Sequence, residues 1–468
     1  MIDLLSAIAS NVWAVFLVVL LFGGSIFVHE LGHFLAARRR GAKVERFSIG
    51  FGPPIWSRRA KDGVEYRVSW FPLGGYVLLP QLADLGAIEG ASETDVAKLP
   101  PVSYATKMIV FGAGAFFNIL FALGLACIVW FVGQPTEGDS TTVAEVVPTV
   151  KNADGKDVPS PAVKAGLRVG DVILEVDGEE VETFSEVRER IALSSGWSKD
   201  GERQIVFKVR RGNEVLELPI NPVISGREKL RVVGFVAEQK LIVGAIHAGS
   251  AVQRAGLQIE DVIVSVNDTA VRTGGQLVTA LKAAPKTFRL GVKRGDQALA
   301  LTVERTPDAK DNVDVGILAF KSGIIFTYPD PLEQVGNAVR MTVRNLGAVL
   351  NRRSDVNVSH FTGPIGIISS FFDVARAGIP FALWFTIIVN VNLAIFNLLP
   401  LPILDGGQML FATIARLRGR PLPLNFIMAA QSVFLVLLLS MILYVSFFDV
   451  RRRLDWRSEP APAAAPAK

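Results

Sequence analysis

The chain has 468 residues, of which 50% are apolar and 20% are charged. Its net charge of +5 does not indicate nucleic-acid binding, because the basic residues cluster beside long apolar stretches. These stretches, about 12–37, 108–132, 381–399 and 424–448, each approach or exceed the roughly 17–25 residues that a membrane-crossing helix needs. The composition therefore predicts a polytopic α-helical membrane protein with four transmembrane helices, and the single cysteine excludes an intramolecular disulfide.

The first predicted transmembrane helix, residues 1–37, contains an H-E-x-x-H pattern at residues 29–33. Residues four apart lie on one face of a helix, so His29 and His33 can bind one metal ion. Glu30 is then placed to act on a water molecule at that ion. Ionisable groups at membrane depth cost on the order of several kcal/mol unless they are partnered, which favours a functional role. A buried, hydrogen-bonded pair of helix histidines is the structural alternative.

Residues 38–107 follow, and their first part is rich in arginine and lysine. A basic flank of this kind is typical of the cytoplasmic end of a transmembrane helix. Residues 44–80 alternate apolar and polar side chains between glycine and proline turns, which predicts two or more β-strands. The second transmembrane helix is expected at 108–132.

The region after the second span is predicted to contain a duplicated domain. Residues 160–181 and 250–271 align at an offset of 90, with nine of 22 positions identical. This similarity predicts two domains of about 85–90 residues, at 133–222 and 223–307. Their A-G-L and G-D pattern resembles PDZ domains of the circularly permuted bacterial kind, which bind peptides by adding a strand to a sheet edge. Either copy could instead be a spacer with a blocked groove.

The connection to the third span occupies residues 308–379. Apolar side chains recur in it with helical spacing, at Leu332, Val335, Val339, Val343, Leu346 and Leu350. This spacing predicts an amphipathic helix that lies on a membrane or protein surface. A fourth transmembrane helix is expected at 424–448, and a disordered tail rich in alanine and proline at 457–468.

The third predicted transmembrane helix, 380–407, carries a candidate for the third metal ligand. Pro400, Pro402 and two glycines cannot continue a regular helix, so the helix must end or unwind just before Asp405. Broken backbone at membrane depth is tolerated where it lines an enclosed, hydrated cavity. The Asp405 carboxylate is then free to join the two histidines. Taken alone, Asp405 would be assigned as an interfacial turn or helix-capping residue.

Four spans place both termini on one side of the membrane. Since no lysine or arginine precedes the first span, the N-terminus and the duplicated domains are predicted outside, and 38–107 inside. The basic residues after the fourth span, Arg451, Arg452, Arg453 and Arg457, disagree with this arrangement, whereas the other flanks agree.

The order of these features is specific. H-E-x-x-H in the first span, two PDZ-like copies, and N-x-x-P-x-P-x-x-D-G at 397–406 together resemble the site-2 protease family of intramembrane zinc metalloproteases, peptidase family M50, and in particular its RseP-like branch. The resemblance implies one zinc ion per chain, with the ligands His29, His33 and Asp405. It implies that Glu30 is the catalytic acid and base.

The resemblance also assigns Asn392 and Asn397 to binding of the substrate backbone, although hydrogen bonding between helices is the structural alternative. The 44–80 region resembles a β-hairpin that dips toward the membrane in this family. In the second span the family often has Gly-Pro-x-x-Asn, whereas residues 114–118 here lack the proline.

The function implied is that of a metalloendopeptidase (EC 3.4.24.-) of the site-2 protease type, in the bacterial inner membrane. Its substrates would be transmembrane proteins: an anti-sigma factor after a first outer cut, in the sigma-E stress response, or remnant signal peptides. The PDZ domains would be periplasmic and bind peptide C-termini, and the active site would face the cytoplasmic side of the lipid bilayer.

Two alternatives from other classes remain. A membrane-anchored PDZ adaptor with an inactive metal site predicts that Glu30→Gln keeps function. A metal transporter predicts several intramembrane acids, whereas the four spans contain only Glu30, with Asp405 at a break.

Overall fold

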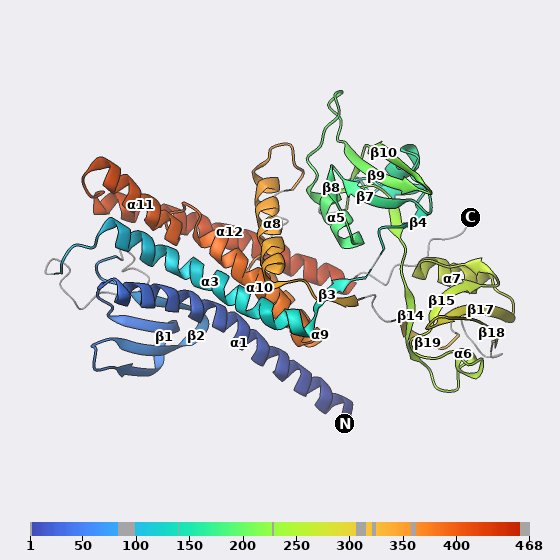
Figure 1. Cartoon of the computed structure of the whole chain (residues 1–468), viewed down its shortest axis with the longest axis horizontal. Coiled ribbons are helices and arrows are strands. Elements are labelled where there is room, and N and C mark those ends of the chain that lie inside the picture. Colours follow the sequence, from blue (N-terminus) through green and yellow to red (C-terminus); the bar gives the residue numbers. More distant parts are fainter. Residues whose placement is uncertain are drawn as a thin grey trace. The chain divides into compact units, whose positions relative to one another are not determined.

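The computed structural model of the chain describes residues 2–82, 99–138, 140–226, 229–305, 315–320, 324–356 and 362–458 (Figure 1). These residues form two compact units. The first unit comprises Met1–Pro135, Thr327–Arg344 and Phe361–Asp455, and the second comprises Thr136–Phe326, Asn345–His360 and Trp456–Lys468.

The first unit is mainly helical. Its helices are α1 (Ile2–Arg39), α3 (Tyr104–Val132), α8 (Pro331–Leu350, which continues into the second unit), α9 (Pro364–Ala377), α10 (Ile379–Asn397), α11 (Asp405–Arg418) and α12 (Leu424–Ser458). Among the described residues, four segments are long and apolar enough to cross a membrane: Ser10–Arg39, Tyr104–Val132, Ile379–Asn397 and Leu424–Arg451. The prediction of four such helices is thus confirmed. The C-terminal tail predicted at 457–468 begins inside α12, and its residues 459–468 lie outside the described part of the chain.

The third predicted span, 380–407, is interrupted before Asp405, as its prolines and glycines predict. Helix α10 ends at Asn397 and α11 begins at Asp405. Pro400 and Pro402 lie between them and interrupt the helical hydrogen bonding. The chain turns so sharply here that a Cβ atom at Gly407 would lie 2.0 Å from the Leu401 carbonyl oxygen. Only glycine fits at this position without a shift of the backbone. The Asp405 side chain that follows this turn lies beside His29 and His33 of α1.

Helices α1, α3, α9 and α10 share one apolar core. Its buried members include Leu17 on α1, Ala126 on α3, Phe371 on α9 and Ile387 on α10. A buried amide also joins two of these helices, since Asn390 donates a hydrogen bond of 2.8 Å to the Ser25 hydroxyl. The packing therefore fixes the first and third predicted spans against each other.

Helix α12 contacts the N-terminal turn of α9 through a carboxylate. The backbone N–H of Gly366 donates to Asp449 Oδ2 at 2.9 Å. Acidic groups stabilise helix N-termini because the first N–H groups have no partner within the helix. The G-P-I-G segment at 363–366 is thereby assigned a structural role in joining α9 to α12.

A β-hairpin packs beside α1. Strands β1 (Arg46–Arg59) and β2 (Glu65–Leu78) pair antiparallel. Burial alone would raise the pKa of Glu65, but a hydrogen bond from Ser57 and the paired guanidinium groups of Arg46 and Arg67 lower it to about 2. The Glu65 carboxylate therefore stays ionised and holds the two strands together near neutral pH.

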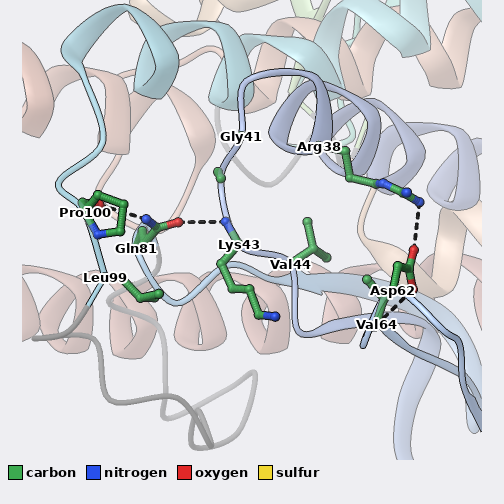
Figure 2. A pocket seen from close by; sticks show the side chains of 10 residues that line it. Arg38, Gly41, Lys43, Val44, Asp62, Val64, Gln81, Leu99 and Pro100 are labelled. Carbon is green, nitrogen blue, oxygen red and sulfur yellow. Dashed lines mark hydrogen bonds and ion pairs between the residues drawn. The ribbon is translucent and has the colours of Figure 1, made fainter.

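Around an open pocket, the turn between β1 and β2 contacts the end of α1, and the residues that flank the hairpin contact each other and the segment before α3 (Figure 2). Arg38 at the end of α1 pairs with Asp62 at 3.1 Å. The Gln81 side chain accepts from the Lys43 N–H at 2.7 Å and donates to the Pro100 carbonyl at 2.8 Å. These contacts fix the hairpin relative to the helix that carries the H-E-x-x-H motif.

The second unit is built mainly from strands. Its first domain contains β4 (Val143–Val146), β5 (Thr149–Lys151), β6 (Asp157–Pro159), α4 (Pro161–Lys164), β7 (Val172–Val176), β8 (Glu179–Glu180), α5 (Phe184–Leu193), β9 (Ile205–Arg211), β10 (Glu214–Ile220), β11 (Val223–Ser225), β12 (Leu230–Val232) and β13 (Phe235–Ala237). Strands β10, β9, β7 and β8 form one sheet in that order. Because β13 pairs with β4, the predicted domain boundary at 222/223 is wrong, and the first domain extends to Ala237.

The second domain repeats this order of elements without counterparts of the short strands β5, β6, β11 and β12. It contains β14 (Leu241–Ile246), α6 (Ala251–Arg254), β15 (Val262–Val266), β16 (Thr269–Ala270), α7 (Gly274–Ala283), β17 (Thr287–Arg294), β18 (Gln297–Glu304) and β19 (Ile317–Phe320). Its sheet has the order β18, β17, β15, β14 and β19, with β16 on β15. Two further strands, β3 (Gln134–Glu137) and β20 (Ile324–Thr327), pair with each other.

The two domains also share an ion pair. Arg211 pairs with Asp171 at 2.7 Å in the first, and Arg294 pairs with Asp261 at 2.7 Å in the second. Each arginine donates in addition to the carbonyl of the glycine in the A-G-L motif. Both aspartate side chains are only 1% exposed, so each buried carboxylate depends on its arginine.

Candidate metal centre

Helix α1 places two imidazoles side by side. His29 and His33 are one helical turn apart, and their Nε2 atoms lie 3.2 Å from each other. The third group is the side chain of Asp405, the first residue of α11. The Asp405 Oδ2 atom is 3.3 Å from His29 Nε2 and 3.4 Å from His33 Nε2. Residues that are far apart in the sequence thus present two nitrogens and one oxygen to a common point.

These separations fit a tetrahedral zinc site. Zinc bonds of about 2.0–2.1 Å at tetrahedral angles place neighbouring ligand atoms about 3.3–3.4 Å apart. The Asp405 Oδ2 atom is buried and receives no well-formed hydrogen bond from the described residues. A cation at the common point would satisfy it. Among the described residues, His29, His33 and Asp405 are the group of three that could hold a metal ion.

Three protein ligands leave the fourth tetrahedral position open, as in catalytic zinc sites. Glu30 lies next to the ligands on α1 and faces the hairpin, since a Cβ atom at Gly75 of β2 would lie 3.0 Å from Glu30 Cγ. The catalytic candidate is therefore held between the metal ligands and a β-strand.

The predicted asparagines occupy different positions. Asn397, the last residue of α10, has its Nδ2 atom 3.4 Å from His29 Nε2 and so lies at the metal centre. Asn392 instead accepts a short hydrogen bond from the Thr342 hydroxyl of α8.

Of the remaining histidines, His247 belongs to the second unit and His360 lies outside the described residues.

Sequence reasoning did not identify the contribution of α3 to this centre. The Val110 carbonyl oxygen lies 2.8 Å from His33 Nδ1, and Asn118 Nδ2 lies 3.2 Å from His29 Nδ1. Gly114 lies between them, and a Cβ atom there would come within 2.4 Å of His33 Nε2. The signal in the sequence was the match of Gly114 and Asn118 to the family's Gly-Pro-x-x-Asn pattern, to which no role at the metal centre was assigned.

The fold and the donor set define a membrane metalloprotease: H-E-x-x-H on an apolar helix, completed by a distant aspartate. Comparison with known proteins gives the family. A family model described as peptidase family M50 matches residues 17–441. The chain belongs to peptidase family M50, as an RseP-like zinc metalloprotease of the site-2 protease type.

Similar proteins extend over nearly the whole chain. The regulator of sigma-E protease RseP of Salmonella typhimurium is 30% identical over 474 residues, covering 94% of this chain and 99% of that protein. Its namesake in Escherichia coli K12 is 28% identical over 480 residues, with the same coverage of 94% and 99%. A protein of Vibrio cholerae named as a candidate zinc metalloprotease is 30% identical over 440 residues, covering 88% and 92%.

Proposed function

We propose that this chain cleaves single-span membrane proteins within the bilayer, using one zinc ion held by His29, His33 and Asp405. The observation that carries the proposal is the convergence of these three side chains at separations of 3.2, 3.3 and 3.4 Å. His29 and His33 come from one helix that is long and apolar enough to cross a membrane, and Asp405 is the first residue of α11, which follows a second such helix. An incoming peptide bond would thus meet the catalytic groups at membrane depth.

The chemistry is peptide-bond hydrolysis. A bound zinc ion would polarise the scissile carbonyl and lower the pKa of a water molecule toward about 7. Glu30 takes the proton from the attacking water and delivers it to the leaving amine. Asn397, beside His29, is placed to donate a hydrogen bond to the substrate backbone. Asn392 would bind the substrate backbone only after losing its hydrogen bond from Thr342 of α8. Substrate binding there would therefore require α8 or the Asn392 side chain to move.

A helical substrate must be unwound before cleavage, because its carbonyls are engaged in its own hydrogen bonds. The β1–β2 hairpin supports this step. Gly75 of β2 lies against Glu30, and residues 75–78 pair with 46–49 of β1 on one side and have no partner strand among the described elements on the other. A substrate segment that adds to such an edge would be extended next to the catalytic groups.

We infer that the two domains of the second unit are tandem PDZ domains on the periplasmic side of a bacterial inner membrane. Their shared element order and matched ion pairs support the duplication. They would exclude substrates with bulky outer domains, and they would bind peptide C-termini. The names of the RseP relatives favour a sigma-E pathway, with an anti-sigma factor as substrate after a first outer cut, and remnant signal peptides as a second class.

The first test compares Glu30→Gln with the wild type. Both are purified in detergent, their zinc content is measured, and each is incubated with a model single-span substrate. We expect zinc to be retained and cleavage to fall by roughly 10²–10⁴-fold, the usual contribution of a general acid–base group. Glu217→Gln, an exposed position in the second unit, is the control and should cleave normally. Wild-type cleavage by Glu30→Gln would rule out Glu30 as the acid and base, and a wild type that cleaves nothing would favour the adaptor with an inactive metal site.

The second test removes residues 136–306. If the domains filter substrates by size, the shortened protein should cleave an untrimmed substrate that the wild type leaves intact. Zinc content shows whether the shortened protein keeps its metal centre. A zinc-loaded deletion variant that still spares the untrimmed substrate would count against the filter.

A further inference from the structure

One face of α3 complements the H-E-x-x-H face of α1. Val110, Gly114 and Asn118 are four residues apart and therefore lie on one side of α3. Val110 contacts His33 and Asn118 contacts His29, so the two helices run in opposite directions at the site. Gly114, between them, lets the helices approach closely enough for both contacts.

Metal binding through Nε2 requires a hydrogen-bond acceptor at the Nδ1 atom of both His29 and His33. An imidazole that binds a metal through Nε2 offers its lone pair there, so a neutral ring carries its proton on Nδ1. That N–H needs an acceptor, and in metal sites the acceptor orients the ring. His33 has one, because the Val110 carbonyl oxygen lies 2.8 Å from its Nδ1 atom. His29 requires a corresponding acceptor.

Asn118 is the neighbour of His29 Nδ1, at 3.2 Å. Its side chain is fully buried, and its Oδ1 atom has no hydrogen-bond partner among the described residues. A rotation of the amide by 180° exchanges the oxygen and nitrogen positions at almost no steric cost. The unpartnered oxygen then accepts the Nδ1–H of His29, which supplies the missing acceptor.

We propose that Asn118 is the positioning residue of the metal centre. Its amide oxygen accepts the His29 Nδ1–H and thereby directs the Nε2 lone pair at the metal. The inference rests on the zinc site of the proposed function, and it gives α3 the task of orienting both histidines. Residue 118 does not touch the metal or the substrate itself.

Asn390 provides a matched control, because it is also a fully buried asparagine with an unpartnered Oδ1 among the described residues. It joins α10 to α1 through Ser25, one helical turn before His29, and donates to Ser25 and the Thr386 carbonyl and not to a metal ligand. If buried asparagines act here only by joining helices, both alanine variants should affect zinc binding alike. If Asn118 orients His29, only its substitution should weaken zinc binding.

The experiment measures zinc affinity of the full chain in detergent by competition with a chromogenic chelator, without reference to cleavage. We expect Asn118→Ala and Asn118→Leu to lose about 10–100-fold in affinity, the usual effect of removing such a partner. Asn118→Asp keeps an acceptor and should stay within about threefold of the wild type. Asn390→Ala should bind zinc normally even where its melting temperature falls.

Two results would overturn the proposal: wild-type affinity in Asn118→Ala, or equal losses in Asn118→Asp and Asn118→Leu. The second comparison uses side chains of similar size, so it decides the question even if the alanine variant does not fold. A wild-type protein that binds no zinc would instead overturn the proposed function, so the two failures are distinguishable.

Discussion

At the scale of single residues, the absence of a side chain at position 114 lets the second span reach the metal ligands. A Cβ atom at Gly114 would lie 2.4 Å from His33 Nε2 and 2.6 Å from His29 Cε1. Such distances are far below van der Waals contact, so Gly114→Ala must push the rings or the helices apart. We expect at least a tenfold loss of zinc affinity, with a parallel loss of cleavage.

The same helix offers a control for this prediction. Gly124 of α3 has no atom within 4 Å of an added Cβ. Replacing a helical glycine with alanine in open space favours the helix by up to about 1 kcal/mol. Gly124→Ala should therefore keep its zinc and melt at the same or a higher temperature. Equal zinc binding by the two variants would contradict the close approach at Gly114.

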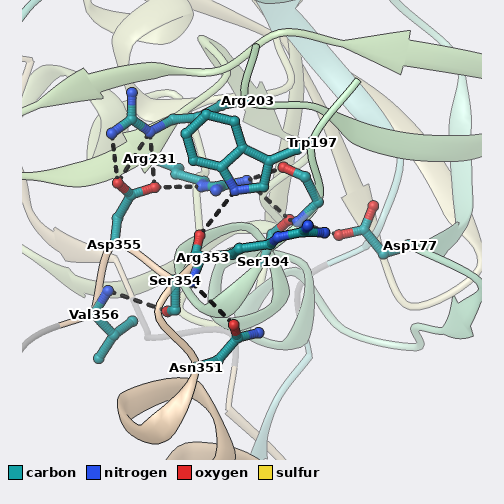
Figure 3. A network of polar contacts seen from close by, with 11 residues as sticks. Asp177, Ser194, Trp197, Arg203, Arg231, Asn351, Arg353, Ser354, Asp355 and Val356 are labelled. Carbon is teal, nitrogen blue, oxygen red and sulfur yellow. Dashed lines mark hydrogen bonds and ion pairs between the residues drawn. The ribbon is translucent and has the colours of Figure 1, made fainter. Parts of the chain in front are cut away.

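At the scale of elements, the segment that follows α8 is bound to the first domain of the second unit (Figure 3). Arg203 donates to both carboxylate oxygens of Asp355, and Arg231 donates to Asp355 Oδ2 at 2.8 Å. The Arg231 side chain is completely buried. The Trp197 indole N–H adds a hydrogen bond of 3.0 Å to the Arg353 carbonyl. This cluster fixes residues 353–355, within the connection to the third span, to the first domain of the second unit.

Asp355 should make this attachment dependent on pH. Burial would raise its pKa, but the hydrogen bonds from Arg203 and Arg231 lower it below its usual value. The pKa of Asp355 is therefore lower in the attached state than in the unfolded chain, where it is about 4. Because of this difference, the ionised carboxylate stabilises the attached state at pH values above about 4. This contribution is lost as the pH falls through the lower folded-state value. The segment should remain attached at pH 7 and become mobile only in acid.

Limited trypsin digestion at pH 7.5 tests the attachment, because Arg352 and Arg353 are exposed cleavage sites on the segment. Asp355→Asn removes the charge and should speed cleavage there about 5–30-fold, which corresponds to a loss of roughly 1–2 kcal/mol. Asp200→Asn, an exposed position in the same unit, should leave the rate unchanged. Equal cleavage rates in both variants would show that the carboxylate does not hold the segment.

At the scale of the whole molecule, the sequence predicted the features that depend on residues close together in the chain. The four apolar helices follow from stretches of sufficient length, and Asp405 was found because prolines and glycines interrupt the third apolar segment beside it. The role of Asn118 was not found, because its contact with His29 joins residues 89 positions apart. The boundary of the first domain was misplaced for the same reason, since β13 pairs with a strand near the start of that domain.

The two domains of the second unit should unfold independently. Each has its own apolar core, one centred on Phe207 and the other on Phe288. Each also has its own ion pair with a buried aspartate. Arg211→Ala leaves Asp171 without its cation, and Arg294→Ala does the same to Asp261. Loss of a hydrogen-bonded partner of a buried carboxylate costs about 2 kcal/mol, allowing for the partial exposure of the arginines.

Hydrogen exchange measured by mass spectrometry on the full chain locates the effect. A loss of about 2 kcal/mol should raise the exchange of slow amides about 30-fold in the affected domain. Arg211→Ala should do so in β7 and β9 while leaving β15 and β17 protected, and Arg294→Ala should give the opposite pattern. The exposed neighbours Arg210 and Lys293 provide alanine controls of similar charge. Faster exchange in both domains from either substitution would show instead that the pair unfolds as one cooperative body.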